Sequence, residues 1–337
     1  MNLPDYNFLS VPLWLITALH LLTLTAHFVA MNFVFGGTMV LLFSRLENKW
    51  QQAEIRKYVK LLPSVMAATV TLGVAPLLFL QLVYGRVVYS AAIVSGWFFL
   101  FVVVAAMIAY YLLYGASFAA DKPDRGFGRY LWPALVTLAY VSFAYSSIFS
   151  LAERPELIEM MYAQDQSGGA INPDIGAYLF RWLHMILGAI TVGGFFVGMI
   201  GRNNDAVFQI ARRAFLYGMV AAMAVGLVYL FTLGEYILAL MRSVGIWALT
   251  VSIFLSLGSM HFFFKKKFLP AGLMLFVSMF GMVATRHVLR LIRLDGVFDP
   301  STIPVDPQWS VFAIFLVCFV LAIVLITYML RLFFSDR

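Results

Sequence analysis

Residues 176–200 read GAYLFRWLHMILGAITVGGFFVGMI, a run whose only charged or imidazole side chains are Arg181 and His184. An apolar run of about 20 residues crosses a bilayer as an α-helix, because each residue advances the helix by about 1.5 Å. Ionisable side chains are costly inside a membrane and usually serve a function there. The run therefore predicts a transmembrane helix that carries a functional imidazole.

Similar apolar runs lie on both sides of this stretch. They cover about 13–44, 61–83, 94–117, 131–151, 210–238, 243–264, 268–291 and 309–334. Hydrophobic residues make up 63% and charged residues 12% of the 337 positions, which excludes an ordinary soluble domain. We expect an all-α, polytopic membrane bundle of about nine transmembrane helices, with residues 1–337 forming one integral membrane domain. The segment 51–60 is expected to be a short amphipathic helix on the inner surface.

Basic residues follow every second predicted helix. They are Arg45, Lys49, Arg56, Lys57 and Lys60, then Lys122, Arg125 and Arg129, then Arg202, Arg212 and Arg213, and finally Lys265, Lys266 and Lys267. Since positive residues mark the cytoplasmic side, the N-terminus is expected outside and the C-terminus in the cytoplasm. We expect a multi-pass protein of a bacterial or archaeal cytoplasmic membrane. The net charge of +7 comes from these inner connections, and no nucleic acid is expected as a partner.

Four of the five histidines, His20, His27, His184 and His287, fall on predicted transmembrane helices. The expected orientation gathers all four in the outer half of the bilayer, which favours metal ligation by haem iron. His20 and His27 lie about 10.5 Å apart along one helix face, so they cannot both be axial ligands of one iron. The alternative is that these histidines hydrogen-bond to neighbouring helices. His261 is expected at the inner interface.

Arginines accompany two of these histidines. Arg181 lies three residues before His184 and shares its helix face, while Arg286 and Arg290 flank His287. A guanidinium beside an imidazole ligand suits the propionates of a haem, because buried carboxylates need a counter-charge. The alternative, compatible with the first, is that these arginines extend to the outer headgroups.

The glycines and the single cysteine bear on how a cofactor could be held. Gly36–Gly37, Gly188 and Gly193–Gly194 lie on histidine-bearing helices, where they permit close helix packing or make room for a flat macrocycle. The sequence does not separate these two roles. Cys318 is the only cysteine, which excludes an internal disulfide, a CxxCH haem attachment and a cysteine-held iron–sulfur cluster within this chain. Any haem is therefore held non-covalently.

The connection at 152–175 is expected on the outer side. Its acidic residues are Glu153, Glu156, Glu159, Asp165 and Asp174, against Arg154 alone. One interpretation is a solvated loop with a short interfacial helix. The other is a docking surface for a basic extracytoplasmic partner.

Several of these motifs resemble the large subunit of cytochrome bd quinol oxidases. The similar residues are Arg181-Trp-Leu-His184 through Gly193–Gly194, Arg213-Ala-Phe and Leu233-Gly-Glu235, and Ala26-His27-Phe28 with Gly36–Gly37 near the N-terminus. The resemblance implies that His184 ligates a low-spin haem b and that His27 ligates a high-spin haem.

The chain also departs from this family. The long extracytoplasmic quinol-binding loop shrinks to about Gly234–Ser243, and the acidic residues of the third helix are replaced by Trp97–Phe101. The family opens its seventh helix with Arg-x-Met, in which Met is the second low-spin ligand. Here Met241 precedes Arg242, and Met241 is the expected substitute. The family's glutamate ligand on the eighth helix corresponds to the neighbourhood of His287.

These features predict a haem-b subunit of a respiratory complex, which passes electrons between membrane quinone and an extracytoplasmic partner such as a multihaem c-type cytochrome. It would be part of a quinol:cytochrome-type oxidoreductase with other membrane subunits, in contact with lipid and quinone, and would hold one or more haems. The expected ligands are His184, His27 and His287, with His20 a further ligand or a group beside one. Arg181, Arg242, Arg286 and Arg290 are the expected propionate partners. The alternatives are a bd-type terminal oxidase that reduces oxygen and a haem-free quinone-binding or scaffolding anchor.

Overall fold

The computed structural model describes residues 8–46, 52–122 and 126–335, and these residues are almost entirely helical. The long helices are α1 (Leu13–Leu46), α2 (Ala53–Val94), α3 (Gly96–Ala119), α4 (Gly128–Leu151), α6 (Ile175–Ile200), α7 (Asp205–Phe231), α9 (Val244–Phe264), α10 (Phe268–Leu294) and α11 (Trp309–Ser335). Two short helices, α5 (Pro155–Gln164) and α8 (Tyr236–Met241), connect some of them. By length and composition, nine helices within the described ranges are able to cross a membrane. The expected all-α multi-pass bundle is therefore confirmed.

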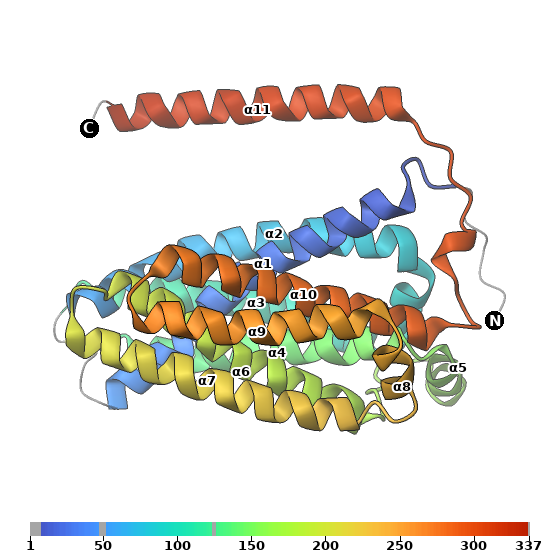
Figure 1. The fold of residues 1–337 in the computed structure, drawn as a ribbon, viewed down its shortest axis with the longest axis horizontal. Helices are drawn as coiled ribbons and strands as arrows, with labels where there is room; N and C mark the ends of the chain where they lie inside the picture. The colour runs from blue at the N-terminus through green and yellow to red at the C-terminus, as the bar shows by residue number, and fades with distance from the viewer. Residues whose placement is uncertain (1–7, 47–51, 123–125, 336–337) are drawn as a thin grey trace. The chain divides into compact units, whose positions relative to one another are not determined.

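The chain divides into two compact units. The first runs from Leu19 to Phe298 and contains most of α1 and all of α2 to α10, whose long helices run side by side as a bundle (Figure 1). The second combines Asn2–Ala18 with Asp299–Arg337. In this second unit the backbone of Leu9 donates to Pro304 O at 2.7 Å and accepts from Asp306 N at 2.9 Å.

Two helix boundaries differ from the sequence-based prediction. The segment expected as a separate helix at 51–60 is, from Ala53 onward, the first part of α2, which continues for 42 residues to Val94. No residue between 53 and 94 ends the helix, and a kink at Tyr84 (φ −109°, ψ 17°) is absorbed within it. The helix expected at 210–238 ends instead at Phe231, and Gly234 beyond it has a φ of +58°. This left-handed backbone is open to glycine and separates α7 from α8.

Close helix packing explains most of the glycines noted in the sequence. Gly36 of α1 lies against the backbone of Ala189 and Gly193 of α6, and Gly194 lies against the backbone of α7. A Cβ at Gly37 would collide with the ring of Tyr58. Glycine at these positions lets the helix backbones approach, which is how helices associate in lipid.

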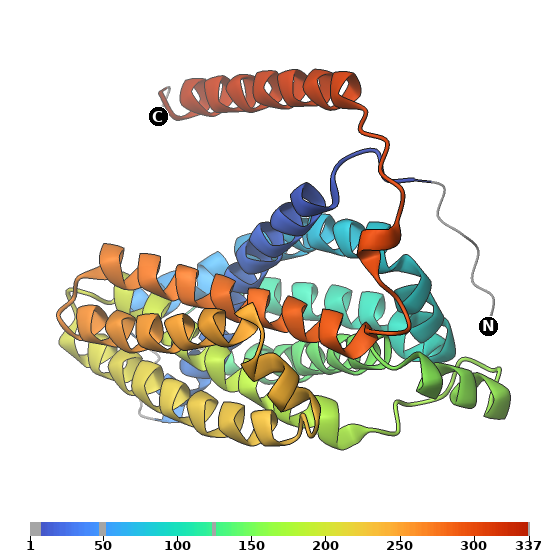
Figure 2. The same cartoon turned by 45° about the vertical axis from the view of Figure 1, so that its right-hand side comes forward.

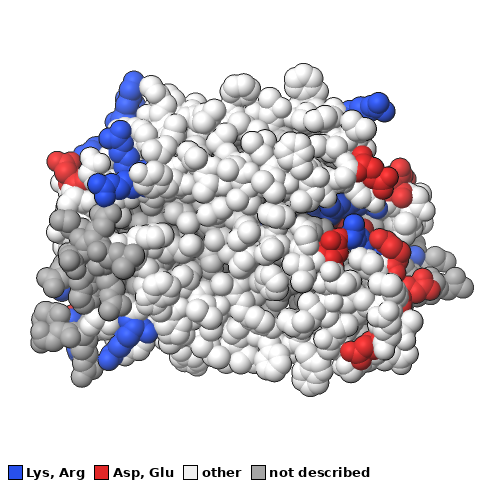
Figure 3. All heavy atoms as spheres, turned by 90° about the horizontal axis from the view of Figure 1, so that it is seen from below, with Lys and Arg blue, Asp and Glu red and all other residues white. Residues whose placement is uncertain are grey.

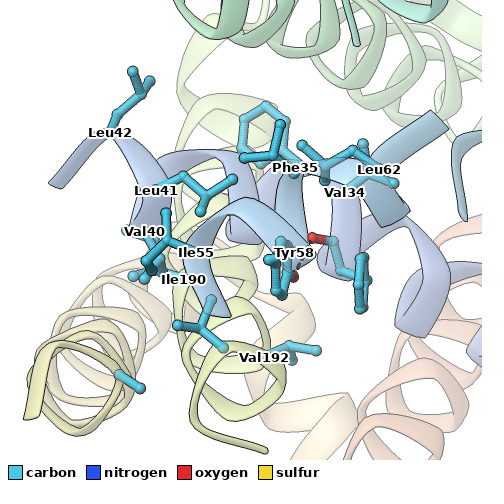
Figure 4. Close-up of a cluster of buried hydrophobic side chains, with 14 of the residues drawn as sticks. Val34, Phe35, Val40, Leu41, Leu42, Ile55, Tyr58, Leu62, Ile190 and Val192 are labelled. Atoms are coloured by element: carbon cyan, nitrogen blue, oxygen red, sulfur yellow. Dashed lines mark hydrogen bonds between the residues drawn. The ribbon is translucent and has the colours of Figure 1, made fainter. Parts of the chain in front are cut away.

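The core of the first unit joins α1, α2 and α6 around Tyr58. Its ring stacks on Phe33 with centroids 4.4 Å apart, and its hydroxyl donates to Phe33 O at 2.8 Å. Figure 4 shows Tyr58 among the aliphatic side chains of Val34, Leu62 and Val192. The hydroxyl is thus satisfied inside an apolar cluster, as burial of a polar group requires.

Charged side chains gather at the ends of the first unit. On the face shown in Figure 3, Lys, Arg, Asp and Glu lie at the two ends and leave an uncharged band between them. At one end Lys266, in the turn that joins α9 to α10, pairs with Asp205, the first residue of α7, at 3.1 Å. Helices α5 and α8 lie at the opposite end (Figures 1 and 2). Lys49 and Arg125, used above to predict the orientation, lie outside the described residues.

Candidate functional site

Three transmembrane histidines make the same hydrogen bond. Nδ1 of His20 lies 3.0 Å from Pro76 O, and Nδ1 of His27 lies 3.0 Å from Thr69 O, both on α2. Nδ1 of His184 lies 2.8 Å from Ala222 O on α7. In each case an imidazole reaches across to a main-chain carbonyl of a neighbouring helix.

This hydrogen bond sets the state of each ring. A carbonyl oxygen only accepts, so Nδ1 must carry the hydrogen, and a neutral ring then has a bare lone pair at Nε2. The structure assigns no hydrogen bond to Nε2 of His20, His27 or His184 within the described residues. An Nδ1–H held by a backbone carbonyl, with Nε2 available, is the usual arrangement of a metal-ligating histidine.

Glycines make room for two of these rings. Gly226 lies four residues after Ala222, and a Cβ there would be 2.8 Å from His184 Nδ1. Gly73 lies four residues after Thr69, and a Cβ there would be 2.9 Å from His27 Cε1. A carbonyl followed by glycine one turn later therefore forms the seat of each imidazole.

His287 lies on α10 and approaches a later part of α2. Its ring meets the ring of Tyr84 edge-on, with centroids 6.3 Å apart. Its Nδ1 is fully buried and has no hydrogen-bond partner among the described residues. The contacts of His27, His20 and His287 thus follow one another along α2, at Thr69, Pro76 and Tyr84.

A buried cluster of charges lies beside His287. Glu153, which is 2% exposed, follows the end of α4 and contacts three arginines of α10. Its carboxylate is 2.5 Å from Arg286 Nη2, 3.1 Å from Arg293 Nη1 and 3.5 Å from Arg290 Nε. We call Glu153, Arg181, Arg286, Arg290 and Arg293 the arginine cluster.

Arg181 of α6 joins the arginine cluster from a second helix. It is buried, donates to Ser146 O and to Ser146 Oγ, and lies within electrostatic range of Glu153 and Arg286. Four arginines thus face a single carboxylate. Burial alone would raise the pKa of Glu153, but the nearby positive charges, that of Arg286 foremost, outweigh burial and lower the pKa from 4.5 to about 2.

The arginine cluster has donors left over. Arg286 Nη1, Arg290 Nη1 and Arg293 Nε are buried without a hydrogen-bond partner among the described residues, and so is the hydroxyl of the nearby Tyr229. Buried donors without partners are costly, and three positive charges are not balanced by Glu153. The arginine cluster therefore has the charge and the donors to hold an anionic group.

Gly188 differs from the other glycines of the histidine-bearing helices. A Cβ built there meets no atom within 4 Å, although Gly188 lies in the middle of α6. It is one turn from His184 and two turns from Arg181, so the three share one side of the helix. Open space, an imidazole and a guanidinium are thus aligned on α6.

The remaining predicted residues lie elsewhere. Met241 and Arg242 are exposed at the end of α8, and the structure does not bring Arg242 into the arginine cluster. His261 is exposed near the end of α9. Among the described residues, no three His, Cys, Asp or Glu side chains converge as they would around a bare metal ion.

Sequence reasoning missed part of this arrangement. The interpretation of residues 152–175 as a solvated loop is wrong for Glu153, which is buried against the arginines of α10. Glu156 and Glu159 are exposed on α5, which fits both a solvated loop and a docking surface. Arg293 is not among the predicted site residues, although its spacing of seven residues from Arg286 puts both on one helix face.

No family model matches the sequence, and no curated protein or solved structure is significantly similar to it.

Proposed function

We propose that this protein binds haem b through its transmembrane histidines and passes electrons between membrane quinone and an extracytoplasmic redox partner, as a subunit of a respiratory complex. The observation that carries the proposal is His184 with its surroundings. Its Nδ1–H is held by Ala222 O, its Nε2 has no hydrogen-bond partner in the described part of the chain, and Gly188 leaves open space one turn away. An imidazole fixed in the ligating tautomer beside an open helix face fits a flat macrocycle.

The arginine cluster fits the same cofactor. A haem b carries two carboxylates, which are costly to bury without positive partners. Arg181 shares a helix side with His184, and Arg286 Nη1 is buried with no hydrogen-bond partner among the described residues. These groups would balance the carboxylates and orient the ring. When no haem is bound, Glu153 would balance part of the positive charge of the arginine cluster.

Haem bound here would supply one-electron redox chemistry. The protein would hold the imidazole tautomer, place positive charge beside the carboxylates, and keep water from the ring by enclosing it among apolar helices. Such burial and charge are the features through which a protein sets a haem potential.

The electron donor and acceptor are proposed on other grounds. Quinone follows from the resemblance to quinol oxidases described above. The outer partner follows from the orientation predicted by the basic connections, which puts the arginine cluster, α5 and α8 on the extracytoplasmic side. A c-type cytochrome is the partner that fits a haem close to that surface, because electrons tunnel over short distances.

The decisive experiment measures haem in the purified protein. A pyridine haemochrome assay is expected to give at least one haem b per chain, and His184→Ala should lose the low-spin signal while His261→Ala keeps it. A folded, lipid-retaining preparation with less than one haem per chain would contradict the proposal and favour a haem-free anchor.

Gly188 allows a test that does not touch a ligand. Gly188→Leu meets no protein atom and replaces a helix-interior glycine, so it should stabilise the helix by about 0.5–1 kcal/mol. If haem lies against this side of α6, the same change should block it. Gly176→Leu, also in open space on α6, is the matched control and should leave the haem content unchanged. Equal haem in both variants would place the cofactor elsewhere.

Oxygen chemistry separates the proposal from a terminal oxidase. Quinol should reduce the haem, an extracytoplasmic cytochrome should reoxidise it, and oxygen uptake should be negligible. Robust quinol-dependent oxygen uptake by the isolated complex would instead identify an oxidase.

A further inference from the structure

We infer that His20 and His287 are the two axial ligands of one iron, in a bis-imidazole site separate from the site at His184. The inference rests on the proposed function, because it assigns ligands to a second haem. It is carried by the contacts that two distant parts of the chain make with α2, together with the electrostatic interaction between the two side chains.

Both rings are anchored along the same stretch of α2. His20 is buried and bonded to Pro76 O, and His287 meets the ring of Tyr84, eight residues further along. The imidazoles themselves come from two other helices: His20 from α1 and His287 from α10. The side chains of His20 and His287 lie within electrostatic range of each other. Opposed imidazoles from two helices are what axial ligation of one macrocycle requires.

Each ring has a nitrogen that is free to bind. The bond to Pro76 O uses Nδ1 of His20, and Nε2 makes no hydrogen bond to the described residues. His287 makes no hydrogen bond through either ring nitrogen to the described residues, and its Nδ1 is fully buried. A buried ring nitrogen without a hydrogen-bond partner is unfavourable unless another group binds it.

Charge selects the kind of metal group. Arg290 lies within electrostatic range of both His20 and His287, and its guanidinium lies 5.1 Å from the ring centroid of Tyr84. A fixed positive charge disfavours a bare divalent cation at this position. It favours an iron macrocycle that brings its own carboxylates, and Arg290 Nη1 is a buried donor without a hydrogen-bond partner among the residues described.

His27 cannot replace either ligand. It lies seven residues from His20, about 10.5 Å along the axis of α1. Its Nδ1 is bonded to Thr69 O, whereas that of His20 is bonded to Pro76 O, two turns further along α2. A ligand to the same iron would have to approach from the opposite side of the macrocycle. His287 belongs to another helix, α10, and is therefore not restricted to the face of α1 that carries His20.

The test compares single and double variants of the purified complex. Electron paramagnetic resonance and near-infrared magnetic circular dichroism report bis-imidazole low-spin haem, and the haemochrome assay counts haems. His20→Ala and His287→Ala should each remove the same bis-imidazole signal, and the double variant should lose no more than either. The signal that depends on His184 should remain.

Two further variants separate ligand loss from misfolding. His20→Gln retains an N–H donor for Pro76 O, so it should keep the thermal stability and still lose the signal. Free imidazole should restore the signal in His287→Gly. If the protein contains haem but His20→Ala and His287→Ala lose different signals, and the double variant loses both, the pairing is overturned while the proposed function stands. Wild-type protein without haem would overturn the proposed function and the pairing together.

Discussion

Among single residues, Glu153 has the most consequential position. It holds Arg286 and Arg293 of α10 from the end of α4, although it is nearly inaccessible to solvent. A buried carboxylate is favourable only when its partners repay the loss of hydration. Here four arginines surround one carboxylate. Removing the negative charge of Glu153 therefore leaves the positive guanidinium groups facing one another.

We therefore expect Glu153→Gln to destabilise the haem-free protein strongly. Breaking a buried ion pair from one side costs about 3–5 kcal/mol, because the remaining charge stays buried without a counter-ion. Thermal unfolding in detergent should show a large fall in Tm. Glu159→Gln on α5, where the side chain is exposed, should shift Tm very little. Equal stability of the two variants would mean that Glu153 does not hold α10 in place.

The same carboxylate predicts a dependence on acid. The pKa of Glu153 falls from 4.5 to about 2 on folding, so the folded state favours the ionised form. A carboxyl with a lowered folded pKa contributes stability that is complete above its unfolded pKa and is lost as the pH falls towards its folded pKa. The contribution should be constant above about pH 5 and should decline from about pH 4.5 to pH 2. Unfolding measured across this window should show a shallower slope in Glu153→Gln than in the wild type.

At the scale of elements, pairs of helices share one way of seating an imidazole. On α2 and on α7 a carbonyl accepts Nδ1–H, and a glycine one turn later lets the ring approach: Thr69 with Gly73, and Ala222 with Gly226. The seat is a property of the neighbouring helix and not of the histidine itself. A ligand's orientation is thus set by its supporting hydrogen bond.

Gly226→Ala should disturb His184 without removing it. The added methyl would lie 2.8 Å from Nδ1, so the ring must move away from Ala222 O. We expect a changed low-spin spectrum and a shifted midpoint potential, while the helix itself gains about 1 kcal/mol from replacing glycine. Gly176→Ala, which meets no atom within 4 Å, is the control and should leave both quantities unchanged. An unaltered potential in Gly226→Ala would argue that His184 is not a ligand.

The sequence predicts the elements better than their contacts. Apolar runs of transmembrane length locate the long helices, because lipid leaves the backbone no alternative to internal hydrogen bonding. The same reasoning ended the second helix at 83 and missed its continuation to Val94, since polar residues near a membrane surface do not by themselves stop a helix. Periodicity put Arg181 and His184 on one face, but it could not show that Glu153, 140 residues before Arg293, closes the arginine cluster. That contact depends on how α4 and α10 pack, which no local pattern records.

At the scale of the whole molecule, the two ends of the first unit carry different charged groups. Glu153 binds the C-terminal part of α10, whereas Lys265–Lys267 precede the N-terminus of the same helix. The 27 residues of α10 span about 40 Å, so the arginine cluster and the lysine turn lie on opposite sides of a bilayer. Which of them faces the cytoplasm decides whether the proposed haem sites are close to the proposed outer partner.

The positive-inside rule predicts that the lysine turn is cytoplasmic and that α5 is outside. We expect this orientation to appear in cysteine labelling on a Cys318→Ser background, which removes the only native thiol. An impermeant maleimide should label Glu159→Cys in intact cells, because Glu159 is exposed on α5. It should label Lys265→Cys only after the membrane is permeabilised, since Lys265 is exposed at the other end of the bundle. The reverse pattern would put the arginine cluster on the cytoplasmic side, and an extracytoplasmic cytochrome would then lie a full membrane thickness, about 30 Å of hydrocarbon, from the proposed haems.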